Sequence, residues 1–123
     1  MSKGKILIVD DDPGILAMLK LMLRLEGYEP VACEDARQVV HTIDREKPDL
    51  VLLDAMMPQL DGIRVLENLR ASNLEHHPPV LLFTGNADES YIRRALDSGA
   101  SGLVVKPFAK EDLLERLQAY LMK

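Results

Sequence analysis

The sequence predicts an α/β domain built on a parallel sheet with helices on both faces. Five short segments rich in β-branched residues or leucine alternate with five segments that repeat apolar residues at helical spacing. That alternation is typical of a sheet in which each helix crosses over between two parallel strands. Several of the strand segments are apolar without interruption, as expected for strands buried on both faces. The expected strands are residues 5–10, 28–33, 49–54, 79–84 and 103–105.

The first strand and the first helix have clear boundaries in the sequence. Residues 5–10 have an unbroken apolar centre, which favours a central place in the sheet. Asp12 stands before a proline, a typical helix start, so we interpret it as a helix cap rather than a metal ligand. Gly27 suits the left-handed backbone that often ends a helix. We expect Met18 and Met22 to lie in the apolar stripe of this helix and to belong to the core.

This first helix carries more apolar residues than one core-facing stripe requires. At 100° per residue they cover more than half of its circumference. They are Ile15, Leu16, Met18, Leu19, Leu21, Met22, Leu23 and Leu25. Two explanations remain open: the leucines overlie neighbouring loops, or the surplus forms a surface for a partner.

The second strand is expected at an edge of the sheet. Glu29 and Pro30 interrupt it, and proline cannot donate a hydrogen bond to a neighbouring strand. The other helices are expected at residues 35–46, from Asp61 onward, at 87–98 and at 111–121. Asp61 before a glycine is a further typical helix start.

Length and composition favour one soluble cytoplasmic domain over residues 1–123. A chain of 123 residues can bury a core without disulfides or a structural metal. A net charge of −5 without a basic stripe argues against direct nucleic-acid binding. The apolar runs are too short to span a membrane, and the first residues do not resemble a signal peptide. Cys33 is the only cysteine, which favours a reducing compartment.

Polar side chains follow the ends of four predicted strands. Asp10 and Asp11 end the first strand, Asp54 ends the third, Thr84 ends the fourth, and Lys106 follows the fifth. The carboxyl ends of parallel strands meet at one edge of a sheet, which is where such proteins bind ligands. We therefore expect these five residues to converge. The three histidines lie away from these strand ends, and no histidine base is expected.

This residue set suits Mg²⁺-dependent phosphoryl transfer to a carboxylate. Carboxylates about 4 Å apart repel by about 4 kcal/mol per pair at an effective dielectric near 20, which calls for a cation. Mg²⁺ prefers oxygen ligands, and Asp11, Asp54 and a phosphoryl group could supply them, with Asp10 acting mainly through a water. Lys106 and Thr84 could hold the phosphoryl oxygens. Asp54 remains as the nucleophile, and its product would be an acyl phosphate.

Taken in order, these segments resemble the response-regulator receiver domains of two-component signalling, the CheY-like family. The matching pieces are residues 6–12, residues 49–54, Met57-Pro58, Asp61-Gly62, Thr84 and residues 106–108. The resemblance implies a flavodoxin-like, doubly wound sheet of five strands in the order 2-1-3-4-5, with five helices. It also implies that a histidine kinase or a phosphotransfer protein donates a phosphoryl group from phosphohistidine, followed by slow self-dephosphorylation.

The resemblance assigns a role to each matching residue. Asp54 corresponds to the phosphorylated aspartate, and Asp10 and Asp11 to the acidic pair that binds Mg²⁺. The backbone carbonyl of Met56 would be a further Mg²⁺ ligand. Thr84 corresponds to the switch hydroxyl and Lys106 to the phosphate-binding lysine. Pro107 matches a proline that the family holds in cis.

The sequence departs from the family pattern at Leu103, where receivers commonly carry tyrosine or phenylalanine. That ring moves inward together with the switch threonine, so aromatic coupling from this position is lost. Leucine could still fill the space that Thr84 leaves. Met56 and Asn86 stand where the attacking water passes, and they should influence the phosphoryl lifetime.

The resemblance also implies two partner surfaces. The kinase's helical phosphodonor domain would dock on the first helix. A downstream protein would read the fourth helix, fifth strand and fifth helix, where Arg93, Arg94 and Leu103 lie. A phosphorylation-dependent dimer is also compatible with the family.

Two other functions compete with the phosphorylated switch. One is a degenerate receiver that takes no phosphoryl group and serves as an interaction module; the intact acidic residues and Lys106 argue against it. The other is a Mg²⁺-dependent phosphatase of the haloacid-dehalogenase type. Its nucleophile lies in an Asp-x-Asp-x-Thr segment, and residues 10–14 lack that threonine. The protein is therefore expected not to be an enzyme, although it would catalyse its own phosphorylation and dephosphorylation.

Overall fold

The computed structural model describes residues 2–86 and 88–121, and it confirms the predicted α/β class. Five parallel strands form one sheet in the order β2-β1-β3-β4-β5, the flavodoxin-like order that the resemblance implied. The strands are β1 (Lys5–Val9), β2 (Glu29–Cys33), β3 (Leu50–Asp54), β4 (Val80–Thr84) and β5 (Gly102–Val105). The α-helices are α1 (Pro13–Leu25), α2 (Val39–Glu46), α3 (Gly62–Ala71), α4 (Glu89–Asp97) and α5 (Lys110–Leu121).

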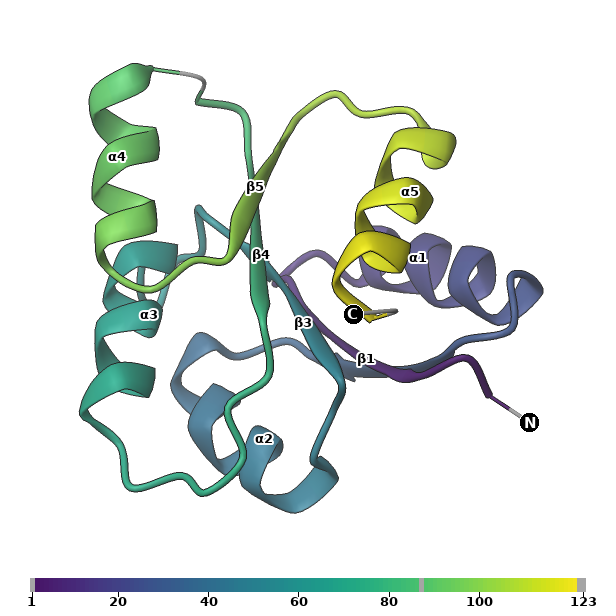
Figure 1. Ribbon diagram of the computed structural model, residues 1–123, viewed down its shortest axis with the longest axis horizontal. Coiled ribbons are helices and arrows are strands. Elements are labelled where there is room, and N and C mark those ends of the chain that lie inside the picture. The colour runs from purple at the N-terminus through teal and green to yellow at the C-terminus, as the bar shows by residue number, and fades with distance from the viewer. Residues whose placement is uncertain (1, 87, 122–123) are drawn as a thin grey trace.

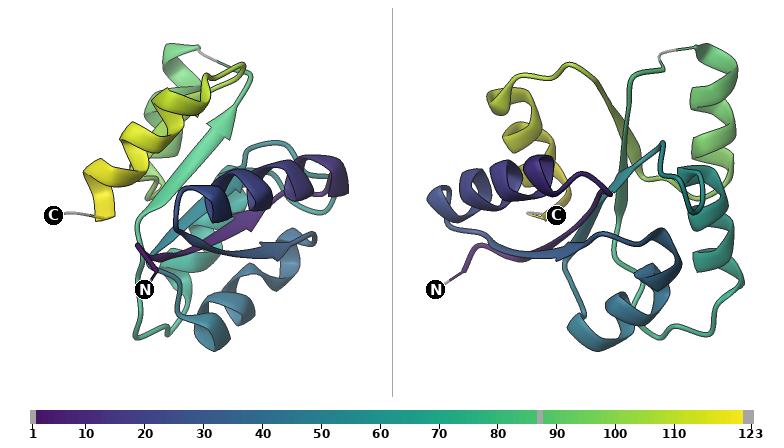
Figure 2. Two further views of the ribbon diagram at one scale, coloured as in Figure 1. Left: turned by 90° about the vertical axis from the view of Figure 1, so that its right-hand side faces the viewer. Right: turned by 180° about the vertical axis from the view of Figure 1, so that it is seen from behind.

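The helices form two layers, one on each face of the sheet. Helices α1 and α5 cover one face, and α2, α3 and α4 cover the other (Figures 1 and 2). Successive strand residues alternate between the two cores: in β3, Val51 and Leu53 face α2 and α3, whereas Leu50 and Leu52 face α1 and α5. This burial on both sides explains why the central strands are apolar throughout. None of the described helices combines the length and apolar character that crossing a membrane requires.

Strand β2 lies at an edge, as its proline predicted. It pairs with β1, where Pro30 lies opposite Ile6. An edge strand tolerates proline because one of its sides needs no hydrogen-bond donors.

The second helical segment begins differently from the prediction. A 3₁₀-helix, η1 (Ala36–Gln38), precedes α2. The Asp35 carboxylate accepts a hydrogen bond from the backbone N–H of Arg37 at 2.9 Å, which favours the tight first turn. The fourth helix begins at Glu89 rather than at residue 87, and Ala87 itself lies outside the described residues.

The expectation that Met18 belongs to the core is wrong, whereas Met22 does pack against the core. The buried residues of α1 are Leu16, Leu19 and Leu23. Met18 lies about 200° around the helix from Leu16, so it points away from the sheet. Its exposed fraction is 56%, and those of Leu21 and Leu25 are 60% and 73%. The surplus of apolar residues on α1 therefore lies on the molecular surface.

Candidate functional site

The structure brings the five predicted site residues to one edge of the sheet. Asp54 and Thr84 are the last residues of β3 and β4, and Asp10 and Lys106 directly follow β1 and β5. Backbone hydrogen bonds hold the strands in register up to this edge, including one of 2.7 Å from the Lys106 N–H to the Thr84 carbonyl. The site is therefore built on the rigid ends of buried strands.

Three carboxylates form a compact acidic cluster at this edge. One carboxylate oxygen from each of Asp10, Asp11 and Asp54 lies within 4.8 Å of the others. Asp10 and Asp54 are only 1% and 5% exposed, whereas Asp11 faces solvent. The carboxylate of Asp10 accepts a hydrogen bond from the backbone N–H of Asp12 through Oδ1, at 2.9 Å. Its Oδ2 is buried and has no hydrogen-bond partner among the described residues.

The electrostatics of Asp10 suit a site for a cation. Burial raises the pKa of Asp10, and the charges of Asp54 and Asp11 act in the same direction. The hydrogen bond from Asp12 and the charge of Lys106 oppose this rise without cancelling it. A buried carboxylate oxygen without a partner, beside two further carboxylates, is a donor set that fits a hard divalent cation such as Mg²⁺.

The two oxygens of Asp54 have different surroundings. Oδ1 accepts hydrogen bonds from the Lys106 ammonium at 3.3 Å and from the Met56 backbone N–H at 3.2 Å. No described residue donates a hydrogen bond to Oδ2. The Lys106 ammonium also lies 4.8 Å from the centre of the Phe83 ring, which helps to orient it over the carboxylate. The peptide bond between Lys106 and Pro107 is cis, as the resemblance implied.

Thr84 is buried beside this carboxylate, and only part of its hydrogen-bonding capacity is used. Its Oγ1 accepts a hydrogen bond from the Asn86 backbone N–H at 3.0 Å. Its hydroxyl hydrogen has no acceptor with normal hydrogen-bond geometry among the described residues. The hydroxyl is therefore free to donate to a ligand that arrives at Asp54.

Met56 lies in the loop that follows β3, two residues after Asp54. Met56 pairs with Asp61 in an isolated antiparallel bridge, and its side chain is exposed. Gly62 allows the loop to pack closely, because a Cβ there would lie 2.6 Å from Leu82 Cδ1 and 2.9 Å from the Ala55 Cα. Asp61 caps α3 through a hydrogen bond of 2.9 Å from the Arg64 N–H, as predicted.

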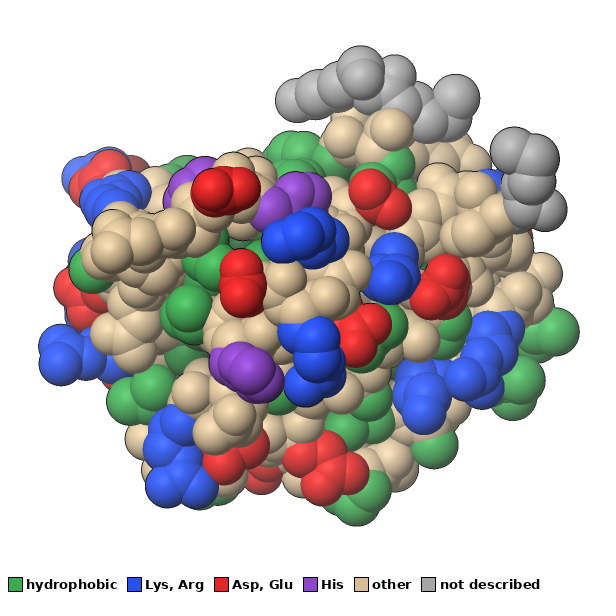
Figure 3. Space-filling view, turned by 90° about the horizontal axis from the view of Figure 1, so that it is seen from below, with side chains coloured by type: hydrophobic (Ala, Val, Ile, Leu, Met, Phe, Trp, Pro, Cys, Tyr) green, Lys and Arg blue, Asp and Glu red, His purple; other side chains and the backbone are tan. Residues whose placement is uncertain are grey.

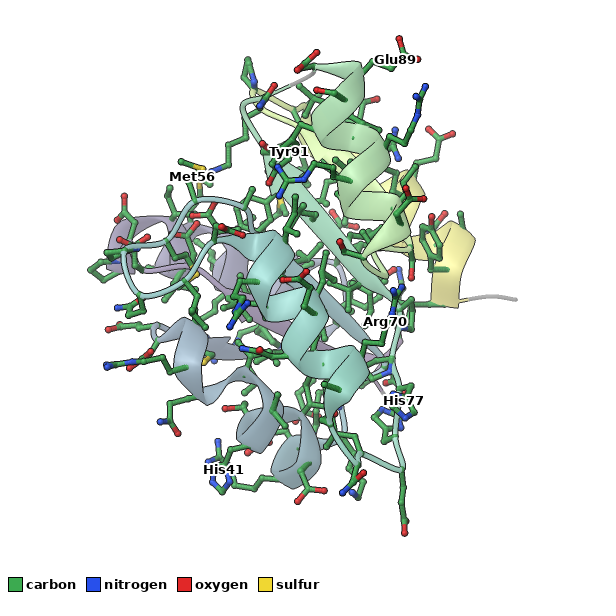
Figure 4. The ribbon with its side chains drawn as sticks, turned by 90° about the vertical axis from the view of Figure 1, so that its left-hand side faces the viewer. His41, Met56, Arg70, His77, Glu89 and Tyr91 are labelled. Atoms are coloured by element: carbon green, nitrogen blue, oxygen red, sulfur yellow. The ribbon has the colours of Figure 1, made fainter. Side chains whose placement is uncertain are left out.

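Other sequence predictions also have clear outcomes. Asp12 caps α1 through the Gly14 N–H at 2.8 Å, which supports its interpretation as a structural residue. Leu103 is buried in the core beneath α3 and α4, so it is not part of an exposed partner surface. His41 and His77 lie at the opposite end of the molecule from Met56 (Figure 4). That opposite edge shows histidines among interspersed acidic and basic side chains (Figure 3).

Sequence reasoning missed Tyr91, which joins the site from α4. Its hydroxyl is buried, and the charges of Asp54 and Asp61 and the Thr84 side chain all act on it. The only signal in the sequence is helical spacing, because Tyr91 precedes the buried Ala95 by four residues and so shares its face.

Relatives of known function match nearly the whole chain. Residues 6–118 match the response regulator receiver domain family. The DNA-binding response regulator MtrA of Mycolicibacterium smegmatis is 38% identical over 121 residues, covering 98% of this chain and 52% of that protein. The alkaline phosphatase synthesis transcriptional regulatory protein PhoP of Bacillus subtilis is 35% identical over 119 residues, covering 97% and 49%. The chain thus spans about half the length of these two relatives.

Solved structures of single domains superpose on nearly the whole of this chain. The BeF3-activated N-terminal receiver domain of Klebsiella pneumoniae RstA superposes with a TM-score of 0.88 at 32% identity, covering 97% of this chain and 99% of that one. The Vibrio cholerae chemotaxis protein CheY4 superposes with a TM-score of 0.87 at 29% identity, covering 98% of both chains. Together with the acidic cluster, Thr84 and Lys106 at the carboxyl edge, these matches show that the chain belongs to the response-regulator receiver domains of two-component signalling.

Proposed function

We propose that Asp54 is the residue that accepts the phosphoryl group, from the phosphohistidine of a histidine kinase or a phosphotransfer protein. The observation that carries this assignment is the asymmetry of its carboxylate. Oδ1 is held by Lys106 and by the Met56 backbone N–H, whereas Oδ2 receives no hydrogen bond from the described residues. A nucleophile needs this combination of a fixed position and one open oxygen.

In the proposed transfer, Asp54 Oδ2 forms a bond to phosphorus as the bond between phosphorus and the histidine nitrogen breaks. The electron pair of the broken bond stays on that nitrogen, and the product on the receiver is an acyl phosphate. The Lys106 ammonium and the Thr84 hydroxyl stabilise the charge on the phosphoryl oxygens. A receiver is not an enzyme in the classical sense, but these residues would catalyse its own phosphorylation and slow dephosphorylation.

The site would also hold Mg²⁺. Asp11, Asp54 and the Met56 backbone carbonyl would bind the ion, with Asp10 contacting it mainly through water. When bound, the ion neutralises the crowded carboxylates and the phosphoryl oxygens. The buried, unpartnered Oδ2 of Asp10 supports this arrangement.

Intact-mass measurement after incubation with acetyl phosphate and Mg²⁺ tests the assignment. A phosphoryl adduct is expected on the wild type and not on Asp54→Ala, and EDTA present during labelling should prevent it. An adduct that persists on Asp54→Ala would refute the role of Asp54. A complete lack of adduct would favour the degenerate interaction module.

The exposed apolar residues of α1 support a docking surface for the kinase's helical phosphodonor domain. Met18, Leu21 and Leu25 are more than half exposed on a helix that begins beside the acidic cluster. Leu25→Asp should therefore slow transfer from the cognate kinase but leave labelling by acetyl phosphate unchanged. Leu96→Asp, on α4, is the matched control because Leu96 is also an exposed helical leucine. Equal transfer rates in both variants would remove α1 from the docking surface.

The output surface is proposed to lie on α4, β5 and α5. Leu96 and Val105 are exposed there, and Arg93 pairs with Glu89 on the surface of α4. The target would be a downstream protein or a second receiver in a phosphorylation-dependent dimer. A DNA-binding effector segment is a further candidate, because the relative MtrA is named a DNA-binding response regulator.

We place the protein in the cytoplasm because its single cysteine suits a reducing compartment.

A further inference from the structure

We propose that a cavity at the amino-terminal edge of the sheet binds a small organic carboxylate, one whose charged group is joined to a compact apolar body. The cavity lies where α2, the end of α3, the loop 72–79 and the turn after α4 meet. Strand β4 runs from this cavity at Val80 to the edge of the acidic cluster at Thr84, so the two sites lie at opposite ends of the sheet. The inference does not depend on the phosphorylation of Asp54, and either proposal can fail without the other.

The inner wall of the cavity is apolar. Leu66 and Leu69 lie three residues apart on α3 and therefore share one face of that helix. Together with Ile43, Leu74 and Val80 they line a volume of about 280 Å³. An apolar cavity of about 150 Å³ is large enough to bind benzene, so this cavity has room for a ring and a short substituent.

The outer part of the cavity offers hydrogen-bond donors. Arg70 follows Leu69 on α3, His77 comes from the loop before β4, and Ser98 directly follows α4. Arg70 and His77 are exposed, and Ser98 is half-buried. Within the described part of the chain, no residue forms a hydrogen bond or an ion pair with any of these three side chains. Their donors are therefore available to a ligand.

The charge at the cavity favours an anion. The chain has a net charge of −5, yet none of the described residues that line the cavity is acidic. Glu75 and Asp97 are neighbours in the sequence, but both are exposed and neither lines the cavity. Figure 4 shows Arg70 and His77 on the same side of the molecule. A planar guanidinium can bind a carboxylate through two parallel hydrogen bonds, which gives a carboxylate an advantage over a neutral ligand of the same shape.

The walls of the cavity are fixed without a ligand. The His76 ring donates a hydrogen bond from Nε2 to the Pro48 carbonyl, and the Val80 N–H donates to Ser101 Oγ at 3.2 Å. The Arg70 guanidinium packs against Gly99, where a Cβ would lie 3.4 Å from Nη2. Gly99 has a φ of 117°, which disfavours any side chain there. A site that is already formed loses less free energy in ordering when it binds its ligand.

The two parts of the cavity together define the ligand class. A carboxylate paired with Arg70 leaves the rest of the ligand to be buried against the leucines of α3. Inorganic phosphate can meet the donors but has no apolar surface to bury. A neutral ring can be buried but leaves the donors without a charged partner. Only an anion with an apolar body uses both parts.

Amide chemical shifts measured during a titration with benzoate test this inference. Saturable shift changes are expected at Leu74, Val80 and Gly99, with a Kd in the millimolar range or tighter. Benzamide, which has the same shape without the charge, and inorganic phosphate, which has no apolar body, should each bind at least tenfold more weakly. Arg70→Gln should weaken benzoate binding at least tenfold. Arg64→Gln is the matched control, because Arg64 is an exposed arginine of α3 that pairs with Glu67 and does not line the cavity.

Several results would overturn the inference. Benzoate that gives no saturable shift change at these three amides would exclude the site. Equal affinities of Arg70→Gln and the wild type, or of benzamide and benzoate, would exclude recognition of the carboxylate. Phosphate that binds as tightly as benzoate would show a plain anion site instead. A similar loss in Arg64→Gln would show a general effect of charge on the protein. Acetyl-phosphate labelling of Asp54 reports separately on the proposed function.

Discussion

Replacing Asp10 with asparagine is expected to stabilise the metal-free protein and to remove most of its response to Mg²⁺. The substitution keeps the shape of the side chain and removes one negative charge from the acidic cluster. The amide oxygen can still accept from the Asp12 N–H. The amide nitrogen would take the place of the unpartnered Oδ2 and could donate to Asp54.

The distances in the cluster set the expected size of the effect. Oxygens of Asp10 and Asp54 lie within 4.8 Å of each other. At that separation and an effective dielectric near 20, the repulsion between two unit charges is about 3.5 kcal/mol. The attraction between Asp10 and Lys106 offsets part of this repulsion. A net gain of about 1–2 kcal/mol in the free energy of unfolding is therefore expected in EDTA.

Urea unfolding followed by circular dichroism, in EDTA and in Mg²⁺, measures this gain. Mg²⁺ should raise the unfolding free energy of the wild type much more than that of Asp10→Asn.

The pH dependence of the unfolding free energy, measured in EDTA, supplies a second test. Because burial raises the pKa of Asp10 above its ordinary value of 3.8, the folded state binds this proton more tightly than the unfolded chain. Wild-type stability should then lose the Asp10 contribution as the pH rises from 3.8 through the folded-state pKa, and the variant should lack this loss.

The outcome that would refute this reasoning is an Asp10→Asn variant that unfolds more easily than the wild type in EDTA. Such a result would mean that the Asp10 charge is stabilised in the metal-free site rather than repelled. Asp11→Asn serves as the comparison, because Asp11 is exposed and its repulsion is screened by solvent. A smaller gain is expected there.

Three further changes give distinct outcomes. Gly62→Ala should lower the free energy of unfolding by about 1–3 kcal/mol in urea unfolding, because its Cβ would meet Leu82; unchanged stability would show that the loop relaxes freely. Asp12→Ala should cost about 1 kcal/mol of stability by removing a helix cap, with acetyl-phosphate labelling retained; lost labelling would instead indicate a metal ligand. Lys106→Met should slow labelling of Asp54 by about 10²-fold or more in timed intact-mass assays, and an unchanged rate would exclude its role in stabilising phosphoryl charge.

The sequence was a good guide to the strands and to their carboxyl ends. Unbroken apolar runs predict buried parallel strands. Because the carboxyl ends of parallel strands meet at one edge of the sheet, the residues Asp54, Thr84 and Lys106 are then expected to lie together. Helix α1 was harder to interpret, because apolar residues cover so much of its circumference that periodicity does not separate Leu16, which is buried, from Met18, which is exposed. That distinction depends on which side of the helix meets the sheet.

Tyr91 was not predictable for a different reason. No motif at the strand ends includes it, and its helical spacing from Ala95 indicates only a core-facing position. Its relation to Thr84 depends on how α4 packs against the sheet, which is a tertiary property. The start of α2 likewise depends on the local hydrogen bond from Arg37 to Asp35, which competes with regular helix at that point.

The unsatisfied atoms of the described residues explain why this edge can work as a switch. Three buried side-chain atoms lack a hydrogen bond: Asp10 Oδ2, Gln59 Oε1 and the Tyr91 hydroxyl. Asp10 follows β1, Gln59 lies in the loop after β3, and the charges of Asp54 and Asp61 act on the Tyr91 hydroxyl from α4's neighbours at the carboxyl edge. A ligand shifts a conformational equilibrium only by the difference in its interactions with the two states. An edge that was fully satisfied without a cation would gain little from binding one, whereas the unpaired oxygen of Asp10 in the acidic cluster gives a cation a free-energy difference to act on.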